Sequence, residues 1–165
     1  SIVVLGIDPG LAIVGYSIIE TDANKIKMLE YGCIKTEAEI STPDRLNIIF
    51  NRLNEIIKQY NPEDMAIEEL FYNKNVKTVI SIGQARGVEV LSGISNGLQI
   101  YEYTPLQIKQ AVVGYGRAEK KQIQNMVKFI LGLNEIPKPD DAADALAVAI
   151  CHSFSLKFKE NFKMK

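Results

Sequence analysis

The spacing of apolar residues changes near residue 43, and this change constrains the fold of the chain more than any other feature. Before it, apolar and β-branched residues form three short runs typical of strands, over 2–7, 13–20 and 25–36. From residue 43 to residue 60, apolar residues recur every three or four positions, which is the period of an amphipathic helix. Three closely linked strands followed by a helix predict an α/β fold that begins with an antiparallel meander.

The remainder of the chain alternates between strand-like and helix-like segments. Strands are expected over 64–70 and 100–103, and helices over 76–97, 105–113, 118–131 and 140–154. Each of the later strands is reached through a helical connection, so it should run parallel to the first strand. This order of elements predicts a mixed five-stranded sheet flanked by helices, the arrangement found in ribonuclease-H-like folds.

The 165 residues suit one domain, which we expect to span 1–155 and to be followed by a basic, flexible tail over 156–165. Hydrophobic residues make up 47% of the chain and charged residues 24%, a composition that excludes an intrinsically disordered protein. No apolar run approaches the roughly 20 residues that a membrane span needs. We therefore expect a cytoplasmic protein that does not associate with membranes.

Cysteine and histidine are too scarce to build the sites that depend on them. Cys33 and Cys151 form no Cys-x-x-Cys pair and are expected to be buried thiols. His152 is the single histidine, which argues against a histidine-rich zinc site and against a Ser-His-Asp triad. A structural role for His152 is the simpler interpretation.

The net charge of −1 conceals a strong asymmetry along the chain. Residues 1–73 contain twelve acidic and six basic residues, whereas residues 74–128 contain three acidic and eight basic residues. Separation of charge in this way predicts a surface that gathers phosphate and another that gathers metal ions. Solvated helix faces would produce the same asymmetry, so charge alone does not decide between the two.

Gly83 and Gly87 lie four residues apart in a segment expected to be helical, so they share one helix face. A face without side chains allows another element to approach closely. Internal packing and self-association of two copies are both compatible with this spacing.

Acidic residues occupy positions that an apolar strand does not require. Asp8 ends the first apolar strand, and Asp141 and Asp144 lie three residues apart at the start of a helix, where they share one face. In the strand that follows the first helix, Glu68 and Glu69 point to opposite faces, and periodicity does not decide which of them joins the others. Helix capping would account for the two aspartates if they stood alone.

Carboxylates at the ends of parallel strands and on a later helix can meet at one edge of a sheet. Clustered carboxylates repel one another unless cations neutralise them, and their hard oxygen atoms suit Mg²⁺ or Mn²⁺. Two such ions about 4 Å apart can hold a phosphate, activate a water and stabilise the leaving oxygen. The acidic residues therefore predict metal-assisted hydrolysis of a phosphodiester.

Five strings carry a likeness to a known family: GIDPG followed by GY (6–10 and 15–16), AIEELF (66–71), GQARG (83–87), VVGYGRAEKKQ (112–122) and DDAADALAVAICH (140–152). Together they resemble the RuvC family of Holliday-junction resolvases, and the likeness extends to about Ser153. The resemblance implies a ribonuclease-H-like fold, a homodimer, and cleavage of four-way DNA junctions by two symmetric nicks. It also implies a branch-migration motor as a partner, in homologous recombination and DNA repair.

The resemblance assigns roles to individual acidic residues. Asp8, Glu68, Asp141 and Asp144 match the family's four catalytic and metal-binding acids. This match selects Glu68 rather than Glu69. It also implies Mg²⁺ as the cofactor, with two ions in each site and Mn²⁺ as an alternative.

The resemblance also implies contacts with DNA. Phe71 matches an aromatic residue beyond the catalytic strand, where its ring would stack on an unpaired base, although a place in the core is the alternative. Lys109 and Lys120 match lysines that contact DNA near the scissile phosphate. Further candidates for DNA contacts are Tyr72, Arg86, Arg117 and Lys121.

Two other functions are compatible with parts of the sequence. The string GIDPG after a strand is similar to the first phosphate loop of actin-like and sugar-kinase ATPases, which would make the chain a nucleotide-binding domain. Those proteins close two related domains over the nucleotide and need later glycine-rich loops, which this sequence lacks. The other alternative is a junction-binding scaffold without catalysis, which metal-dependent cleavage would distinguish from a nuclease.

Overall fold

The computed structural model describes residues 1–69 and 75–165, and it confirms the predicted α/β class. The strands are β1 (Ile2–Asp8), β2 (Ile13–Thr21), β3 (Ile26–Lys35), β4 (Asp64–Glu68) and β5 (Gln99–Tyr103). The helices are α1 (Thr42–Tyr60), α2 (Val76–Ser95), α3 (Pro105–Val112), α4 (Lys120–Leu131), α5 (Asp140–Phe154) and the 3₁₀ helix η1 (Leu156–Phe162).

The five strands form one mixed sheet in the order β3-β2-β1-β4-β5. β1, β2 and β3 pair antiparallel, as the short connections between them require. β4 pairs parallel to β1, and β5 pairs parallel to β4, because α1 and α2 carry the chain back before each of these strands begins. The predicted topology is therefore confirmed, and the carboxyl ends of β1 and β4 lie side by side.

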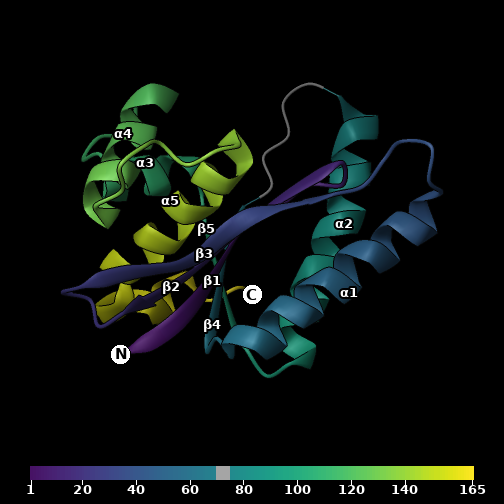
Figure 1. Ribbon diagram of the computed structural model, residues 1–165, viewed down its shortest axis with the longest axis horizontal. Coiled ribbons are helices and arrows are strands. Elements are labelled where there is room, and N and C mark those ends of the chain that lie inside the picture. Colours follow the sequence, from purple (N-terminus) through teal and green to yellow (C-terminus); the bar gives the residue numbers. More distant parts are fainter. Residues whose placement is uncertain (70–74) are drawn as a thin grey trace.

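Helices cover both faces of the sheet (Figure 1). α1 and α2 cover one face, where Ile49 and Ala85 pack in the same core as Leu5 and Ile67 of the sheet. α3, α4 and α5 cover the opposite face, where their apolar residues pack in a second core. α5 is almost wholly buried, which explains its long run of alanine and aliphatic residues.

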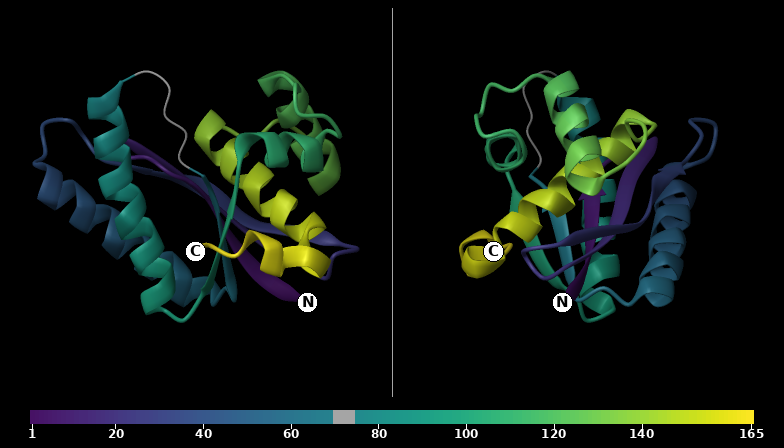
Figure 2. Two further views of the ribbon diagram at one scale, coloured as in Figure 1. Left: turned by 180° about the vertical axis from the view of Figure 1, so that it is seen from behind. Right: turned by 60° about the vertical axis from the view of Figure 1, so that its left-hand side comes forward.

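Residues 156–165 differ from the flexible tail expected from the sequence, since the structure places them against the edge of the sheet (Figure 2). Tyr101 and Lys163 form an antiparallel bridge, and the Met164 amide donates a hydrogen bond to the Ile100 carbonyl at 2.9 Å. The ring of Phe162 packs against that of Tyr103, with 4.8 Å between centroids. The segment therefore lies along the outer edge of β5.

His152 and Asp64 form a buried pair beneath this segment. His152 Nε2 lies 2.8 Å from Asp64 Oδ2, and His152 Nδ1 lies 2.6 Å from the Tyr103 hydroxyl. Lys159 Nζ donates a second hydrogen bond to Asp64 Oδ2 at 3.2 Å. Both ring nitrogens of His152 therefore have partners inside the fold, which supports the structural role expected for this residue.

The two thiols differ in exposure. Cys151 is buried in the second core, as expected, whereas Cys33 on β3 is only partly buried. Within residues 1–69 and 75–165, no helix is long and apolar enough to span a membrane.

Candidate active site

Asp8 and Glu68 lie next to each other at the ends of two parallel strands. Ile7 of β1 pairs with Ile67 of β4, so the next residue on each strand is an acid. Side chains alternate along a strand, which places Asp8 and Glu68 on the face that packs against α5. Glu69 is exposed, and its amide donates to the Tyr103 carbonyl. The geometry thus brings Glu68, not Glu69, beside Asp8.

The start of α5 approaches the sheet closely enough to bring Asp141 and Asp144 to the same place. This approach depends on Gly15 of β2, because a Cβ atom at this position would overlap with the main-chain carbonyl of Asp141. The Ser17 hydroxyl donates a hydrogen bond of 2.8 Å to the Ala145 carbonyl, one turn further along α5. The GY string of the sequence therefore has a clear role, since its glycine allows the helix to dock.

The electrostatics of these side chains indicate that they form one cluster. Burial, followed in order of effect by the nearby carboxylates of Asp144, Glu68 and Asp141, raises the pKa of Asp8 from 3.8 to about 8. Burial, followed by Asp144, raises the pKa of Glu68 from 4.5 to about 7, while Lys109 acts in the opposite direction. Burial also raises the pKa of Asp144 against the effect of Lys120. Without a cation, the carboxyl groups of Asp8, Glu68 and Asp144 therefore hold protons more readily than isolated carboxyl groups do.

The chemistry of this donor set fits a hard divalent cation. None of the four acids forms an ion pair with a lysine, arginine or histidine among the described residues. Carboxylate oxygens that repel one another in a partly buried site are typical ligands of Mg²⁺. As they stand, no three His, Cys, Asp or Glu side chains in the described ranges converge closely enough to hold an ion. Binding would therefore draw the carboxylates inward.

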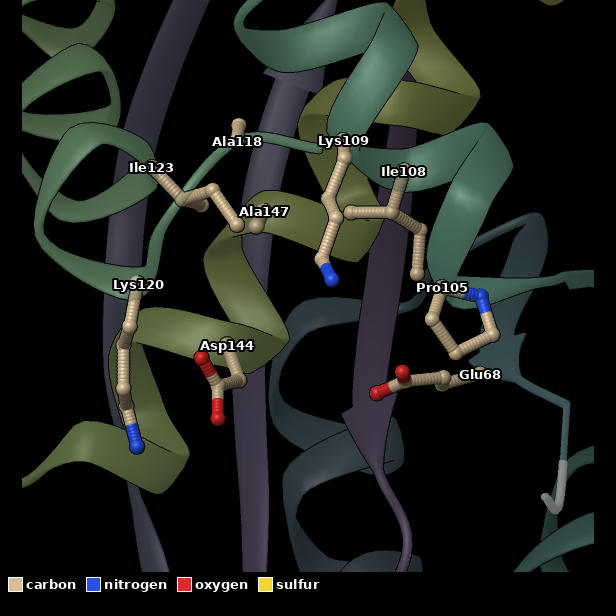
Figure 3. Close-up of a pocket in the computed structure, with 9 residues that line it drawn as sticks. All are labelled: Glu68, Pro105, Ile108, Lys109, Ala118, Lys120, Ile123, Asp144 and Ala147. Carbon is tan, nitrogen blue, oxygen red and sulfur yellow. The ribbon is translucent and has the colours of Figure 1, made fainter. Parts of the chain in front are cut away.

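A pocket of about 280 Å³ opens beside the cluster (Figure 3). Glu68 and Asp144 line it together with Lys109 of α3 and Lys120 of α4. Lys109 points into the space between the two carboxylates, and Lys120 lies beside Asp144. Lys120 Nζ also forms an ion pair of 3.0 Å with Asp140. The structure thus brings two of the predicted DNA-contacting lysines to the acids.

The remaining predicted DNA contacts lie in different settings. Arg86 is largely buried: its Nε and Nη2 each lie 3.3 Å from the Glu68 carbonyl, and Nη2 forms an ion pair of 2.8 Å with Glu102. These contacts hold the end of β4 and leave little of Arg86 for DNA. Arg117 and Lys121 are exposed close to Lys120. Phe71 and Tyr72 lie outside the described residues.

Sequence reasoning missed Glu102, the partner of Arg86. Glu102 lies opposite Ile67 in the register of β5 against β4, so its position near the site becomes visible only after the strands pair. Its sole signal in the sequence is a charged residue within a short strand. Because β5 pairs with β4, Glu102 lies close to the active site, and its ion pair with Arg86 holds the Arg86 side chain there.

Comparison with known proteins agrees with this geometry. The family model described as crossover junction endodeoxyribonuclease RuvC matches residues 4–152. A protein of that name from Finegoldia magna is 65% identical, and the alignment covers 98% of this chain and 99% of the relative. The structure of Thermus thermophilus RuvC has a TM-score of 0.90 at 34% identity, with 98% of each chain covered. The same protein in complex with a Holliday junction substrate has a TM-score of 0.87 at 32% identity, with 95% and 96% covered. The chain belongs to the RuvC family of crossover junction endodeoxyribonucleases.

Proposed function

We propose that this chain resolves four-way DNA junctions by metal-dependent hydrolysis of a phosphodiester at Asp8, Glu68, Asp141 and Asp144. The cluster of four acids beside a lysine-lined pocket, with raised pKa values at Asp8, Glu68 and Asp144, is the observation that carries the proposal. The Thermus thermophilus relative in complex with a Holliday junction substrate supports the choice of substrate. Action in homologous recombination and repair, together with a branch-migration motor, is part of the proposal.

The acidic residues of the site serve to bind cations, and the lysines serve to bind the phosphate. The four carboxylates would hold Mg²⁺, two ions in each site, with Mn²⁺ as an alternative. When bound, the ions neutralise the carboxylates and polarise the scissile phosphate. Lys109 and Lys120 bind phosphate oxygens from the other side and stabilise the negative charge that increases in the transition state. A water adds to phosphorus and gives up a proton as one P–O bond breaks, and the leaving oxygen takes up a proton, so each nick leaves ends that a ligase can seal.

Two symmetric nicks need two active sites, and an exposed stripe on α2 supports a homodimer. Four apolar side chains on one face of this helix are each more than half exposed: Val76, Ile80, Leu91 and Ile94. The buried side of α2, with Ala85 and Glu89, lies on the opposite face. A Cβ at Gly87, between the two apolar pairs, would meet nothing within 4 Å. At Gly87 we therefore favour self-association over internal packing as the reason for a glycine.

The decisive experiment uses a synthetic four-way junction and a linear duplex, each with and without Mg²⁺. The unmodified protein should make paired symmetric nicks in the junction only, and only with Mg²⁺. Asp8→Asn should bind the junction without cutting it, whereas Asp22→Asn, a change at an exposed turn, should cut normally. Tight junction binding without nicks from the unmodified protein would favour a scaffold and contradict the nuclease.

A further inference from the structure

A second pocket, of about 510 Å³, lies on the other side of the acidic cluster. It is lined by the turn between β1 and β2, the first turns of α2, Arg45 of α1, and Asp141. We call it the flanking pocket. Asp8 interacts with Glu68 and Asp144, which line the pocket of Figure 3, and with Asp141, which lines the flanking pocket. The two pockets therefore adjoin the same acids.

Arg45 is held in a fixed orientation at the flanking pocket. Its Nε donates to the Thr36 hydroxyl at 3.0 Å, and its Nη2 donates to the Thr36 carbonyl at 3.2 Å. The Thr36 hydroxyl in turn donates to the Leu11 carbonyl at 2.6 Å. Arg45 is thus tied to the turn that follows Asp8, and its remaining N–H groups are pre-organised to bind an anion.

The lining of the flanking pocket contains two cations, Arg45 and Lys77, and one acid, Asp141. Neither Arg45 nor Lys77 forms an ion pair within residues 1–69 and 75–165. The hydroxyl groups of Thr78 and Ser81 line the same pocket. The Lys77 and Thr78 amides already bond to the Asn75 side chain, at 3.0 and 3.4 Å. An anion would therefore be held by side chains and not by the helix terminus.

The rest of the lining is apolar, with Pro9, Leu11 and Ile82 among its members. A nucleotide has the matching character, because its phosphate is anionic and its sugar presents apolar C–H groups. A small inorganic anion would leave the apolar lining without a partner. The pocket combines an anchored arginine, a lysine and two hydroxyls with apolar walls. This combination fits a nucleotide better than it fits a purely anionic or a purely apolar ligand.

We propose that the flanking pocket binds the nucleotide adjacent to the scissile phosphate on the cleaved strand, with its phosphate at Arg45 and Lys77. This inference rests on the proposed nuclease function, because it takes the cut site to be at Asp8. The cleaved strand then runs from Lys109 and Lys120 across the four acids to Arg45. Binding on both sides of the cut fixes the strand in the orientation that hydrolysis requires.

The test is a thermodynamic cycle between one phosphate and one arginine. Junctions are made with a single neutral methylphosphonate at each position within two nucleotides of the cut, on either side. Their dissociation constants are measured with Asp8→Asn protein, with and without a second change, Arg45→Ala. At one position, the neutral linkage should weaken binding about fivefold or more in the presence of Arg45 and have no effect after its removal.

Two further variants keep the result interpretable. Arg52→Ala removes another arginine of α1, half exposed and paired with Glu55, and should leave the effect of every methylphosphonate unchanged. Arg45→Ala could also disturb the turn that Arg45 contacts through Thr36. Lys77→Ala avoids this, because it changes an exposed side chain. In the Lys77→Ala protein, the methylphosphonate at the same position should likewise no longer weaken binding.

The outcomes separate this inference from the nuclease proposal. If the unmodified protein nicks junctions but no position couples to Arg45 or Lys77, the flanking pocket does not bind the strand and the inference fails alone. If the unmodified protein neither binds nor nicks the junction, both proposals fail. Coupling at one position, absent for Arg52, supports the flanking pocket.

Discussion

The carboxyl group of Asp8 has a higher pKa in the folded protein than in the unfolded chain. Its folded pKa of about 8 lies well above the ordinary value of 3.8, first because of burial and then because of three neighbouring acids. Between these two values the folded state holds a proton that the unfolded state has released. The free energy of unfolding of the metal-free protein should therefore fall as pH rises through this window.

Replacing Asp8 by asparagine should stabilise the metal-free protein, because it removes the ionisation that folding disfavours. We expect Asp8→Asn to raise the melting temperature by a few degrees at pH 8, since about 1 kcal/mol corresponds to roughly 2–4 °C at this chain length. The difference should shrink as the pH falls below 3.8, where the Asp8 carboxyl is protonated in both the folded and the unfolded state. Thermal unfolding followed by circular dichroism in EDTA measures this, and an Asp8→Asn protein less stable at pH 8 would contradict it.

Divalent cations should restore the stability that the metal-free protein loses at high pH, because they take the place of the protons on the carboxylates. Added Mg²⁺ should raise the melting temperature of the unmodified protein more at pH 8 than at pH 6, because binding must displace protons from Asp8 and Glu68. Asp8→Asn should respond much less at both pH values. Equal shifts for the two proteins would place the cations elsewhere.

At the scale of elements, the active site depends on how closely α5 docks on β2. Two of the four acids belong to the first turns of this helix, and the others end β1 and β4. Gly15 sets the distance between helix and sheet, since its missing side chain leaves room for the Asp141 main chain. A small shift of α5 would therefore move Asp141 and Asp144 together relative to Asp8.

Gly15→Ala should separate folding from catalysis. The added Cβ would overlap with the Asp141 carbonyl, so the start of α5 must move outward. A displacement of about 1 Å can cost about a hundredfold in rate, and we expect junction cleavage to fall by about that factor while junction binding persists. Single-turnover cleavage and binding assays measure the two effects. Unchanged cleavage would indicate that α5 can shift without disturbing its aspartates.

The order of the elements could be predicted because each has a strong local period, but contacts between distant segments could not. The Glu68 and Glu69 ambiguity illustrates the limit: alternation puts them on opposite faces, and only the packing of α5 decides between the faces. Arg86 carries a charge typical of a DNA contact, yet Glu102 draws it inward once β5 pairs with β4. The segment after α5 is similar, since its lysines and phenylalanines give no local sign of the edge it covers.

At the scale of the whole molecule, the proposed dimer determines whether the two nicks are paired. The apolar stripe on α2 faces away from the core, so disturbing it should not unfold the protomer. Each protomer supplies its own four acids in this arrangement. Loss of the dimer should therefore uncouple the two cuts and leave the chemistry of each site in place.

Leu91→Glu should yield a monomer, because it puts a charge in the middle of the stripe. Light scattering should give half the mass of the unmodified protein, and any remaining junction cleavage should be single nicks. Phe129→Glu is the matched control, since Phe129 on α4 is 78% exposed but lies outside the stripe. A Leu91→Glu protein with the mass of the unmodified protein would mean that the copies meet elsewhere.

The two edges of the sheet are closed off in different ways, and this bears on aggregation. β3 carries exposed lysines at Lys27 and Lys35, and its pairing with β2 is interrupted by a register shift at Ile18 and Ile19, both of which discourage another strand from joining. β5 is short and uncharged along much of its length, and the bridge between Tyr101 and Lys163 occupies its outer side instead. Peeling residues 156–165 away would expose a strand edge on which copies of the chain could stack, so this segment protects solubility at a distance from the catalytic acids.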